Sequence, residues 1–405
     1  MKIKVALVLT LISALAFSVI PTLYTDNPAF VFESPRKHLD LSDLNVGIDL
    51  TNNLITIDDV NNLLTGKKIT FDSTRLELIG SEGFLLLPNV LVSDYINVGL
   101  GKLKLGVDAK VSANVTMNLP SEAMSFVFGD YDFGESLDST FTLFKGGIYS
   151  EGGLLLGLKL GSISMALEGG AYVPVVWFDK ESVSSFHYSS DEDKGSFEIA
   201  ISGKQRLYSL LNSLDSSEID SEELSNSAGY YVNFGAMWDI GDIKIAAAIN
   251  NYSVKPARLE YAGCATITYE ASYSNLKFSS ATPVIEYPKG ELEKLEEPIE
   301  VSIPYEVNLF ASYNISAFDI ALHGKFVPDI EYSEFGGYLG FRDIIWVDLT
   351  MLPNDLWKKE VGLNFDMKYF RLTATAGVID AGGLLNADLS KMTGMSVKIG
   401  FGLGF

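Results

Sequence analysis

Apolar and polar residues alternate with a period of two over long stretches of the chain. The clearest case is the carboxyl end, where every second residue is apolar: Met395, Val397, Ile399, Phe401, Leu403 and Phe405. Residues 103–117 repeat the pattern, with Leu, Val, Ala and Met on one side and Lys, Gly, Asp, Ser, Asn and Thr on the other. Because successive side chains of a β-strand point to opposite faces, this alternation predicts strands with one apolar and one polar face.

Twelve segments carry the alternation: residues 45–51, 94–100, 103–117, 148–160, 163–177, 229–238, 243–252, 305–313, 318–327, 361–367, 369–379 and 395–405. From residue 94 onward, the links between them are alternately short and long. The Greek-key connections of a soluble β-sandwich would scatter these lengths, whereas an up-and-down barrel places short turns at one end and long loops at the other. The sequence therefore predicts an all-β fold, an up-and-down antiparallel transmembrane β-barrel of about 12 strands, with small helical elements in loops or a plug.

The strand lengths suit a bilayer. Ten or eleven residues, at roughly 3.3 Å each and tilted by roughly 40°, rise about 25 Å. A sheet in hydrocarbon satisfies its backbone only by closing on itself, which would pair the strand at 45–51 with the last strand. Residues 258–273 and a hairpin within 337–349 also have strand character. If these stretches join the wall, the strand number rises to about 14 or 16.

The amino terminus has the features of a secretory signal peptide. Lys2 and Lys4 precede an apolar run, and Ala14-Leu15-Ala16 matches the small-x-small rule for signal peptidase. The run is shorter than the roughly 20 residues that a membrane-spanning helix needs. We expect cleavage before Phe17, which divides the chain into a signal peptide (1–16), a periplasmic lead-in (17–40) and the barrel (41–405).

Two segments within the barrel region do not fit the wall pattern. In residues 52–93, the stretch 58–64 predicts a short helix that ends before Gly66, and residues 84–90 form an apolar patch. This segment folds back into the lumen as a plug or forms a compact surface loop. In the long external loop 178–228, four leucines at helical spacing predict a helix over the barrel mouth: Leu207, Leu210, Leu211 and Leu214.

The composition limits the chemistry. The 405 residues carry 52 carboxylates against 30 Lys and Arg, a net charge of −22, so there is no basic excess to bind nucleic acid. The single cysteine, Cys264, excludes an intramolecular disulfide and a cysteine-based zinc site. The motifs of a nucleophile elbow, a P-loop, a zinc-protease helix and a dinucleotide site are absent from the sequence. We therefore expect no enzymatic activity, no cofactor and no metal site.

Strand parity assigns charged side chains to the inner face of the barrel. The predicted lumen-lining residues are Lys104, Asp108, Lys110, Lys159, Glu168, Lys244, Glu306, Asp319, His323, Lys325, Asp366, Arg371 and Lys398. Together with Asp49 they are nearly balanced in charge, so the acidic excess lies in the loops, above all in residues 179–223. We expect a negative outer vestibule above a mixed polar lumen, and side chains of this kind set the preference of a pore for ions.

These features together resemble bacterial outer-membrane β-barrel proteins. The likeness includes the last strand, whose Ile399, Phe401, Leu403 and Phe405 resemble the signal read by the barrel-assembly machinery. Asn27-Pro28-Ala29 is similar to a tripeptide near the start of barrels related to long-chain fatty-acid transporters, and it also fits an ordinary turn before the first strand. The overall layout further resembles barrels of bacteria with a loose outer sheath, or toga.

Three functions fit these expectations. The first is a pore in the bacterial outer membrane for diffusion of small hydrophilic solutes, with a weak preference for cations. The second is a plugged, toga-like structural barrel of the outer envelope. The third is a transporter of apolar compounds, which a lumen lined with Lys and Asp disfavours. The expected partners are outer-membrane lipid, the barrel-assembly machinery and further copies of the chain in a trimer.

Overall fold

The computed structural model of the protein describes most of the chain after the predicted signal peptide. It describes residues 27–34, 36, 38–65, 83–128, 134, 136–191, 193–213, 225–274, 277–280, 284–286, 288, 291–330, 332–342, 344–353, 356–367, 369–380 and 392–405. The predicted cleavage site, Ala14-Leu15-Ala16 before Phe17, lies outside these residues, as do Gly66 and Leu214.

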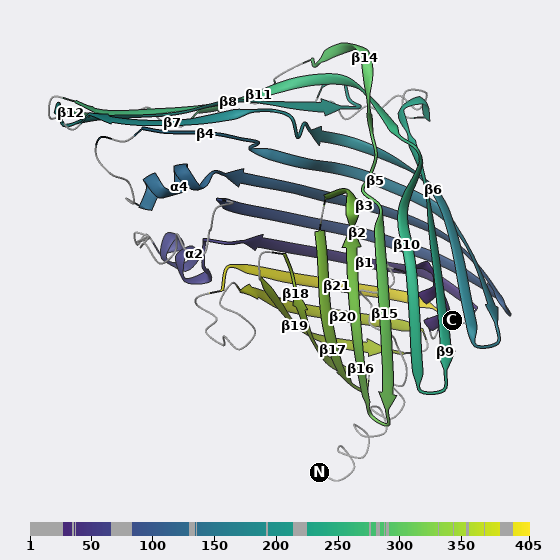
Figure 1. Cartoon of the computed structure of the whole chain (residues 1–405). Helices are drawn as coiled ribbons and strands as arrows, with labels where there is room; N and C mark the ends of the chain where they lie inside the picture. Colours follow the sequence, from purple (N-terminus) through teal and green to yellow (C-terminus); the bar gives the residue numbers. More distant parts are fainter. Residues whose placement is uncertain are drawn as a thin grey trace.

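The chain forms a closed antiparallel barrel of 14 strands. In order, the wall consists of β1 (Leu39–Asn52), β2 (Phe84–Leu100), β3 (Leu103–Leu119), β5 (Phe144–Leu160), β6 (Ile163–Phe178), β9 (Gly229–Ile240), β10 (Ile243–Lys255), β15 (Glu306–Ile315), β16 (Phe318–Val327), β17 (Tyr332–Phe341), β18 (Ile345–Met351), β19 (Trp357–Asp366), β20 (Phe370–Asp380) and β21 (Gly394–Gly404). Each strand pairs with the next, and β1 closes the barrel against β21, with Val46 opposite Ile399. The all-β barrel and the predicted closure are confirmed (Figure 1).

The number of strands differs from the first expectation of about 12. All twelve predicted segments lie in the wall, and the two additional strands are β17 and β18, the hairpin that residues 337–349 suggested. The link predicted as long from 328 to 360 is therefore two short links around this hairpin, one of which holds the 3-10 helix η4 (Pro328–Ile330). Residues 257–274 also form a strand, but it lies outside the wall.

The outer surface of the wall is apolar. On β5, Leu154 and Leu156 are 69% and 51% exposed, whereas Leu155 between them is 5% exposed. Neighbouring strands repeat this alternation, with Val107 and Val111 of β3 exposed and Asp108 buried. Such a band of outward apolar side chains is the lipid-facing surface of a transmembrane barrel. No helix among the described residues is long and apolar enough to cross a bilayer.

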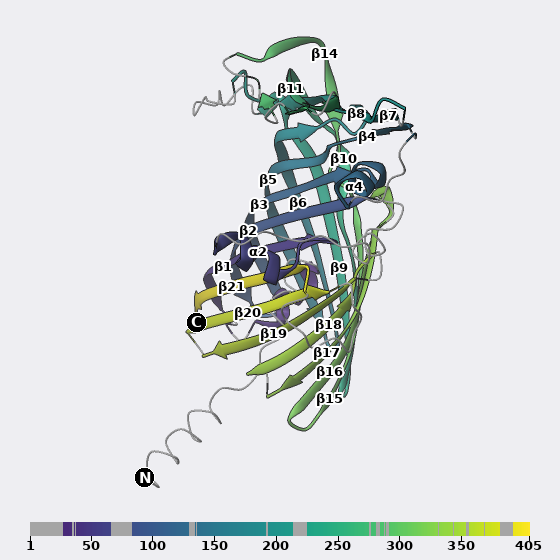
Figure 2. The same ribbon diagram turned by 90° about the vertical axis from the view of Figure 1, so that its left-hand side faces the viewer.

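A second group of strands extends the sheet beyond the wall at the end where the long loops lie. It consists of β4 (Ser136–Phe141), β7 (Ser184–Asp191), β8 (Ser196–Ser209), β11 (Ala257–Ser274), β12 (Lys277–Ser280), β13 (Val284–Glu286) and β14 (Glu293–Val301). We call this group the flap. It joins the wall where β8 pairs with the end of β6, and Figure 2 shows it beyond one side of the barrel, with β14 outermost. The barrel is therefore much taller on one side than on the other.

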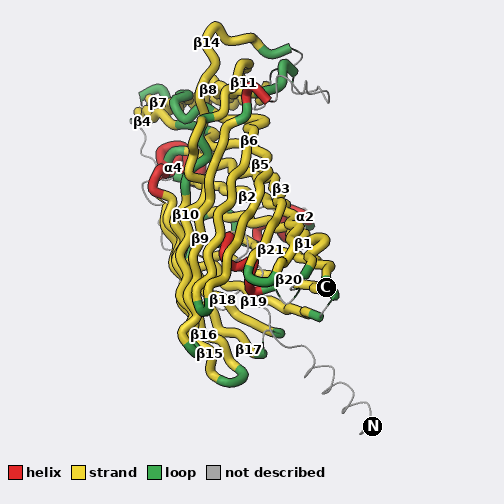
Figure 3. Tube along the Cα trace, turned by 90° about the vertical axis from the view of Figure 1, so that its right-hand side faces the viewer, coloured by secondary structure: helices red, strands yellow, loops and turns green. Residues whose placement is uncertain are grey.

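The flap has one apolar and one polar face. Leu137, Tyr188, Ile199 and Ala271 lie in one row across its strands, and the row beside it begins with Asp138 and His187. The apolar face packs over helix α4 (Ser121–Phe128), which Figure 3 shows beside the flap strands. The predicted helix through Leu207 and Leu210 is wrong. Leu207 lies in β8, paired with Gly263 of β11, and both leucines are buried.

Residues 52–93 contribute one short helix and part of the wall. The expected helix is α2 (Ile57–Leu64), which lies at the same end of the barrel as α4 (Figure 1). The apolar patch at 84–90 is the first part of β2, where it pairs with both β1 and β3. Among the described residues, the segment that occupies the barrel interior is a different one, at 27–34.

Candidate functional site: the plugged interior of the barrel

A short amino-terminal segment lies inside the barrel. Residues 27–34 form the 3-10 helix η2 (Pro28–Glu33) with Asn27 before it and Ser34 after it, and we call this segment the plug. Asn27 caps the helix, because its Oδ1 accepts a hydrogen bond from the Ala29 amide at 2.9 Å, and Pro28 takes the first turn, where an amide is not needed. Ala29, Phe30 and Val31 are at most 3% exposed. The plug packs against β5, β6 and β9.

The side chain of Asn27 fixes the plug to the wall. Its Nδ2 donates to the backbone carbonyl of Ala247 at 3.2 Å and to that of Ala236 at 3.5 Å. Ala236 and Ala247 are paired across β9 and β10, so one amide spans two strands. Gly235 is required here, because a Cβ at this position would overlap Asn27 Oδ1. The tripeptide Asn27-Pro28-Ala29 is thus a wall anchor.

Around the plug, the inner wall is apolar. The contacting side chains come from consecutive strands β5 to β18: Leu155, Ala166, Met237, Ala246, Phe310, Ala321, Tyr338 and Trp346. Phe30 packs edge to face on Phe310, with ring centroids 5.4 Å apart. We call this set the apolar layer. It excludes water from one side of the lumen at the level of the plug.

Across the lumen from the apolar layer, the interior near the tight turns is charged. Arg36, which follows the plug, forms an ion pair with Asp40 of β1 and lies 3.6 Å from Asp43. Asp43 is also paired with Arg371 of β20, and Lys104 Nζ donates to the Arg36 carbonyl at 3.3 Å. All five side chains are buried. Two predicted lumen residues, Lys104 and Arg371, are therefore held in contacts at the base of the plug.

A band of alternating charges lies nearer to the loop end of the barrel than the plug and the apolar layer do. It consists of Glu306, Lys325, Glu334, Lys358, Glu360, Lys398, Asp49, Lys110 and Glu151, in order around the wall from β15 through β21 to β5. We call it the charge ring. Along β16, Lys325 follows Ala321 of the apolar layer by four residues, a rise of about 10 Å toward the loops. A molecule entering from the loop side would meet the charge ring before the plug.

Most members of the charge ring are paired. Lys325 Nζ lies 2.9 Å from Glu306, and Lys110 Nζ lies 3.2 Å from Glu151. The Glu360 carboxylate has three partners. It forms ion pairs with Lys398 at 3.2 Å and Lys358 at 3.7 Å, and it accepts a hydrogen bond from the Ser396 hydroxyl at 2.6 Å. Glu360 is buried because it lies between these partners.

The charge ring also acts across the lumen. Lys110 of β3 is within electrostatic range of Glu306 of β15, and Lys358 of β19 is within range of Asp49 of β1. Five carboxylates and four ammonium groups make the ring nearly neutral. Partly buried charges interact more strongly than exposed ones, so the ring forms a polar lining of the lumen.

Next to the charge ring, Asp108 and Glu168 are buried beside Tyr231. The Tyr231 hydroxyl donates to Glu168 Oε1 at 3.1 Å, and Asn233 Nδ2 donates to the same oxygen at 2.8 Å. Gly153 and Gly170 lie between Asp108 and Tyr231 in one cross-strand row, and the tyrosine ring lies over Gly170. Asp108 and Glu168 were predicted from parity, but Tyr231 was not.

The other predicted lumen residues lie at several places. Lys244 is paired with Glu33 of the plug, and Lys159 Nζ lies 3.6 Å from Asp239 near the tight turns. Asp319 accepts from Asn314 at 2.7 Å beside a tight turn. Asp366 ends β19, and its side chain is outside the description. The predicted set is therefore not one site but belongs to the charge ring, the plug contacts and the turns.

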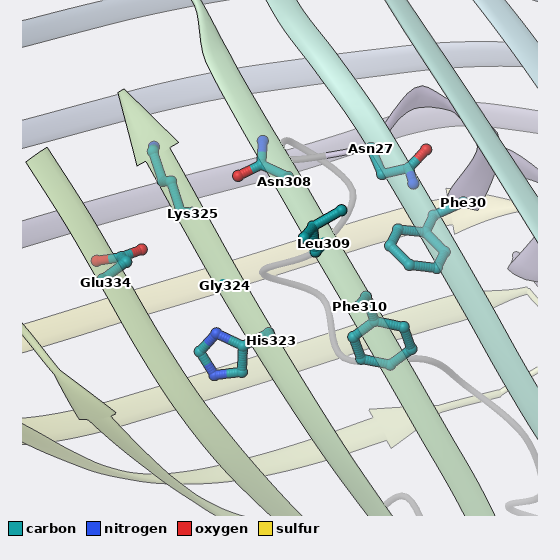
Figure 4. Close-up of a pocket in the computed structure, with 9 residues that line it drawn as sticks. All are labelled: Asn27, Phe30, Asn308, Leu309, Phe310, His323, Gly324, Lys325 and Glu334. Atoms are coloured by element: carbon teal, nitrogen blue, oxygen red, sulfur yellow. The ribbon is translucent and has the colours of Figure 1, made fainter. Parts of the chain in front are cut away.

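A small pocket lies between the plug and the charge ring. Nine residues line it: Asn27, Phe30, Asn308, Leu309, Phe310, His323, Gly324, Lys325 and Glu334 (Figure 4). His323 Nε2 is 2.8 Å from Asp348 Oδ2, whose other oxygen accepts from Thr350 at 2.5 Å. In the described part of the chain, no group of three His, Cys, Asp or Glu is placed to hold a metal ion.

Sequence reasoning missed several residues that form this interior. They are Asn27, Glu33, Arg36, Asp40, Asp43, Glu151, Tyr231, Glu334, Lys358 and Glu360. Glu151 had a usable signal, because it lies at an inward position of the predicted strand 148–160. Glu360 was assigned to the link 328–360, one position before the predicted strand 361–367. Arg36 had none, because its partners are set by the path of the chain into the barrel.

A closed barrel with an apolar outer surface and a charged interior defines a membrane-spanning β-barrel, the class to which bacterial outer-membrane barrels belong. No family model and no curated protein matches the sequence. Among solved structures, the chain is similar to the Ralstonia pickettii toluene transporter TbuX (TM-score 0.46, 8% identity, 96% of this chain and 95% of that chain). It is also similar to the P. putida toluene transporter TodX (0.42, 10%, 94% and 92%) and to a mutant of Rh. blastica porin (0.29, 9%, 91% and 99%).

Proposed function

We propose that the protein is a channel of the bacterial outer membrane for small hydrophilic solutes, and that its plug holds the channel closed. The observation that carries the proposal is the charge ring, which lies between the loops and the plug. Lys325, Glu360 and Lys398 are typical of its members, since each is charged and directed to the interior. Charged side chains at a constriction select polar solutes and ions.

The charge ring disfavours an apolar solute. Such a molecule would have to displace ions or water from groups such as Lys110 and Glu151 without offering hydrogen bonds in return. Leaving a buried charge without its partners costs several kcal/mol. A small polar or ionic solute replaces those interactions instead.

The loop end favours cations. On the flap, β14 carries four exposed glutamates against one exposed lysine: Glu293, Glu296, Glu297 and Glu300 against Lys294. The charge ring adds five carboxylates to four ammonium groups. Exposed charge of this kind raises the local concentration of cations, and salt screens it over about 10 Å at 0.1 M.

The apolar layer supports a second candidate, a transporter of apolar compounds. Its side chains, among them Phe310, Tyr338 and Trp346, would become an apolar surface inside the barrel if the plug moved away. The layer also serves as the seat of the plug, and that role accounts for it without any ligand. The two candidates differ in what passes once the plug is loosened.

The deciding experiment compares the intact protein with a variant whose plug no longer fits the apolar layer. Phe30→Ser, Val31→Ser and Phe32→Ser are combined, and Val183→Ser on the exposed loop is the matched control. In planar bilayers we expect rare, brief openings from the intact protein and the control, and stable cation-preferring conductance from the triple variant.

Three other outcomes would contradict the proposal. Strong anion selectivity would refute the role of the acidic mouth. A triple variant that conducts no ions but lets a fluorescent naphthylamine into vesicles would favour the apolar transporter. Silence from a correctly folded triple variant in both assays would favour the plugged structural barrel.

A further inference from the structure

The barrel closes at one seam, between its first and last strands. Leu39 and Phe405 exchange backbone hydrogen bonds there, at 2.9 and 2.8 Å. The pairing shifts register between Asp40 and Ser42, so the ladder is interrupted at the end where the chain enters β1. Closure at this point relies on side chains as well as on the backbone.

The side chain that covers this part of the seam comes from the segment just after the plug. Arg36 is 1% exposed, and its guanidinium contacts Asp40 and Asp43 of β1. Ser34, the last residue of the plug, donates to the same Asp40 carboxylate at 3.2 Å and accepts from the Arg36 amide at 3.3 Å. One carboxylate of β1 therefore binds both the end of the plug and Arg36.

The last strand leaves space for this guanidinium. A Cβ at Gly402 would lie 2.9 Å from Arg36 Nη2 and 3.2 Å from its Cζ. At Gly404, a Cβ would lie 2.6 Å from Arg36 Cδ. Both glycines are on the inner face of β21, opposite Asp43 and Asp40. The Arg36 side chain therefore packs directly against the backbone at two alternate glycines of the last strand.

The charges around Arg36 join further strands to this point. Arg371 of β20 is paired with Asp43, and Lys104 of β3 donates to the Arg36 carbonyl and lies 3.9 Å from Asp40. Three cations and two carboxylates thus link β20, β21, β1 and β3. Removing one member of a buried ion pair leaves its partner uncompensated, so these contacts form or break together.

We propose that Arg36 is a clasp between the plug and the closing seam, so that the plug is fully seated only when β1 and β21 are paired. This inference rests on the closed-plug part of the proposed function. It adds that the plug is tethered at Ser34 and Arg36, and that it opens by movement of residues 27–33 about this fixed point. Loosening the clasp must therefore loosen both the seam and the plug.

The test uses Gly402→Ala with Gly400→Ala as its matched control. The added methyl group at 402 meets the flexible end of Arg36 and displaces it without removing any charge. At 400, two residues away on the same face, it lies 2.7 Å from Asn45 Oδ1 of β1 and 3.5 Å from Thr373 Cβ. It therefore disturbs the seam to a similar degree without touching Arg36. Hydrogen exchange of the full chain in nanodiscs then reports the seam (residues 39–46 and 395–404) and the plug (28–33) separately.

We expect Gly402→Ala to speed exchange at least about tenfold in both regions, and Gly400→Ala to change exchange in the plug by no more than about twofold. Arg36→Gln should reproduce the effect of Gly402→Ala. Equal behaviour of the two alanine variants, or acceleration by Gly402→Ala in only one of the two regions, would overturn the clasp. Exchange is measured whether or not the barrel conducts, so a silent channel would refute the proposed function and leave this result intact.

Discussion

The side-chain amide of Asn27 donates a hydrogen bond to the backbone carbonyl of Ala247, 220 positions further along the chain. This single contact sets the height at which the plug lies in the barrel, because Asn27 is also the cap of η2. Gly235 of the wall leaves space for the Asn27 side chain, because a Cβ at this position would overlap it.

Asn27→Ala should unseat the plug while the wall stays intact. It removes the donors to two wall carbonyls and the cap of the helix, a loss of about 1–3 kcal/mol. We expect more frequent channel openings in planar bilayers and faster exchange at residues 28–33. Asn27→Asp keeps the cap but cannot donate to the carbonyls, so it should show the same openings. Unchanged gating in both variants would exclude Asn27 as the anchor.

Leu154→Arg should destabilise the barrel. Leu154 is 69% exposed on the outer surface, six residues from the tight turn after β5, which places it about 15 Å above that turn and near the middle of the apolar band. A charge there should cost about 2–4 kcal/mol. Urea unfolding in lipid vesicles measures it, with Leu154→Phe as the control that keeps the surface apolar. Equal stability of the two variants would mean that this face does not meet lipid.

Glu360→Gln should weaken the charge ring and shift ion selectivity. The substitution leaves Lys358 and Lys398 without their shared carboxylate and changes the formal balance of the ring from five acids and four bases to four of each. We expect a loss of about 1–3 kcal/mol in unfolding free energy. In the plug-loosened background, the reversal potential in a salt gradient should move toward anions. A reversal potential identical to that of the parent would show that the ring does not lie on the conduction path.

Phe405→Ala should impair assembly more than stability. The backbone of Phe405 makes three hydrogen bonds at the seam, which the substitution keeps, while its ring is half exposed on the outer surface. We expect lower amounts in the outer membrane at low expression but an unfolding free energy within about 1 kcal/mol of the parent. Leu403→Ala tests the same strand without changing its last residue. Normal membrane levels for Phe405→Ala would rule out the aromatic end as an assembly signal.

Much of the wall was predictable because its strands obey one rule, apolar outside and polar inside. The rule failed at β17 and β18, where the inner face carries Tyr338 and Trp346 of the apolar layer. Aromatic residues on both faces remove the alternation, so these two strands were predicted only as an alternative, the hairpin within 337–349. In the flap, the strand character of residues 258–273 indicated β11, whereas β8 was missed because Leu207 fits a helical spacing and a strand row equally well.

The plug was not predictable from local pattern. Asn27-Pro28-Ala29 gives the sequence of a capped turn, but its position depends on Ala236 and Ala247, which are distant in the chain. Parity assigned the charged residues to a face of the barrel, whereas their pairing depends on barrel register and curvature. Lys325 and Glu306, for example, are close because β15 and β16 are hydrogen-bonded neighbours.

The flap makes one side of the molecule different from the other, because it extends the barrel on that side alone. Its polar face, with Asp138, Glu198 and Ser202 exposed, lies beyond the barrel wall on one side (Figure 2). In the outer-membrane location that we propose, with the long loops outside, antibodies added to intact cells should reach this hydrated sheet first. The turn at residues 193–195, which joins β7 to β8, is exposed and ends in Gly195 at φ +56°. In the proposed orientation, an epitope grafted at this turn should therefore be displayed on the cell surface without touching the charge ring or the plug.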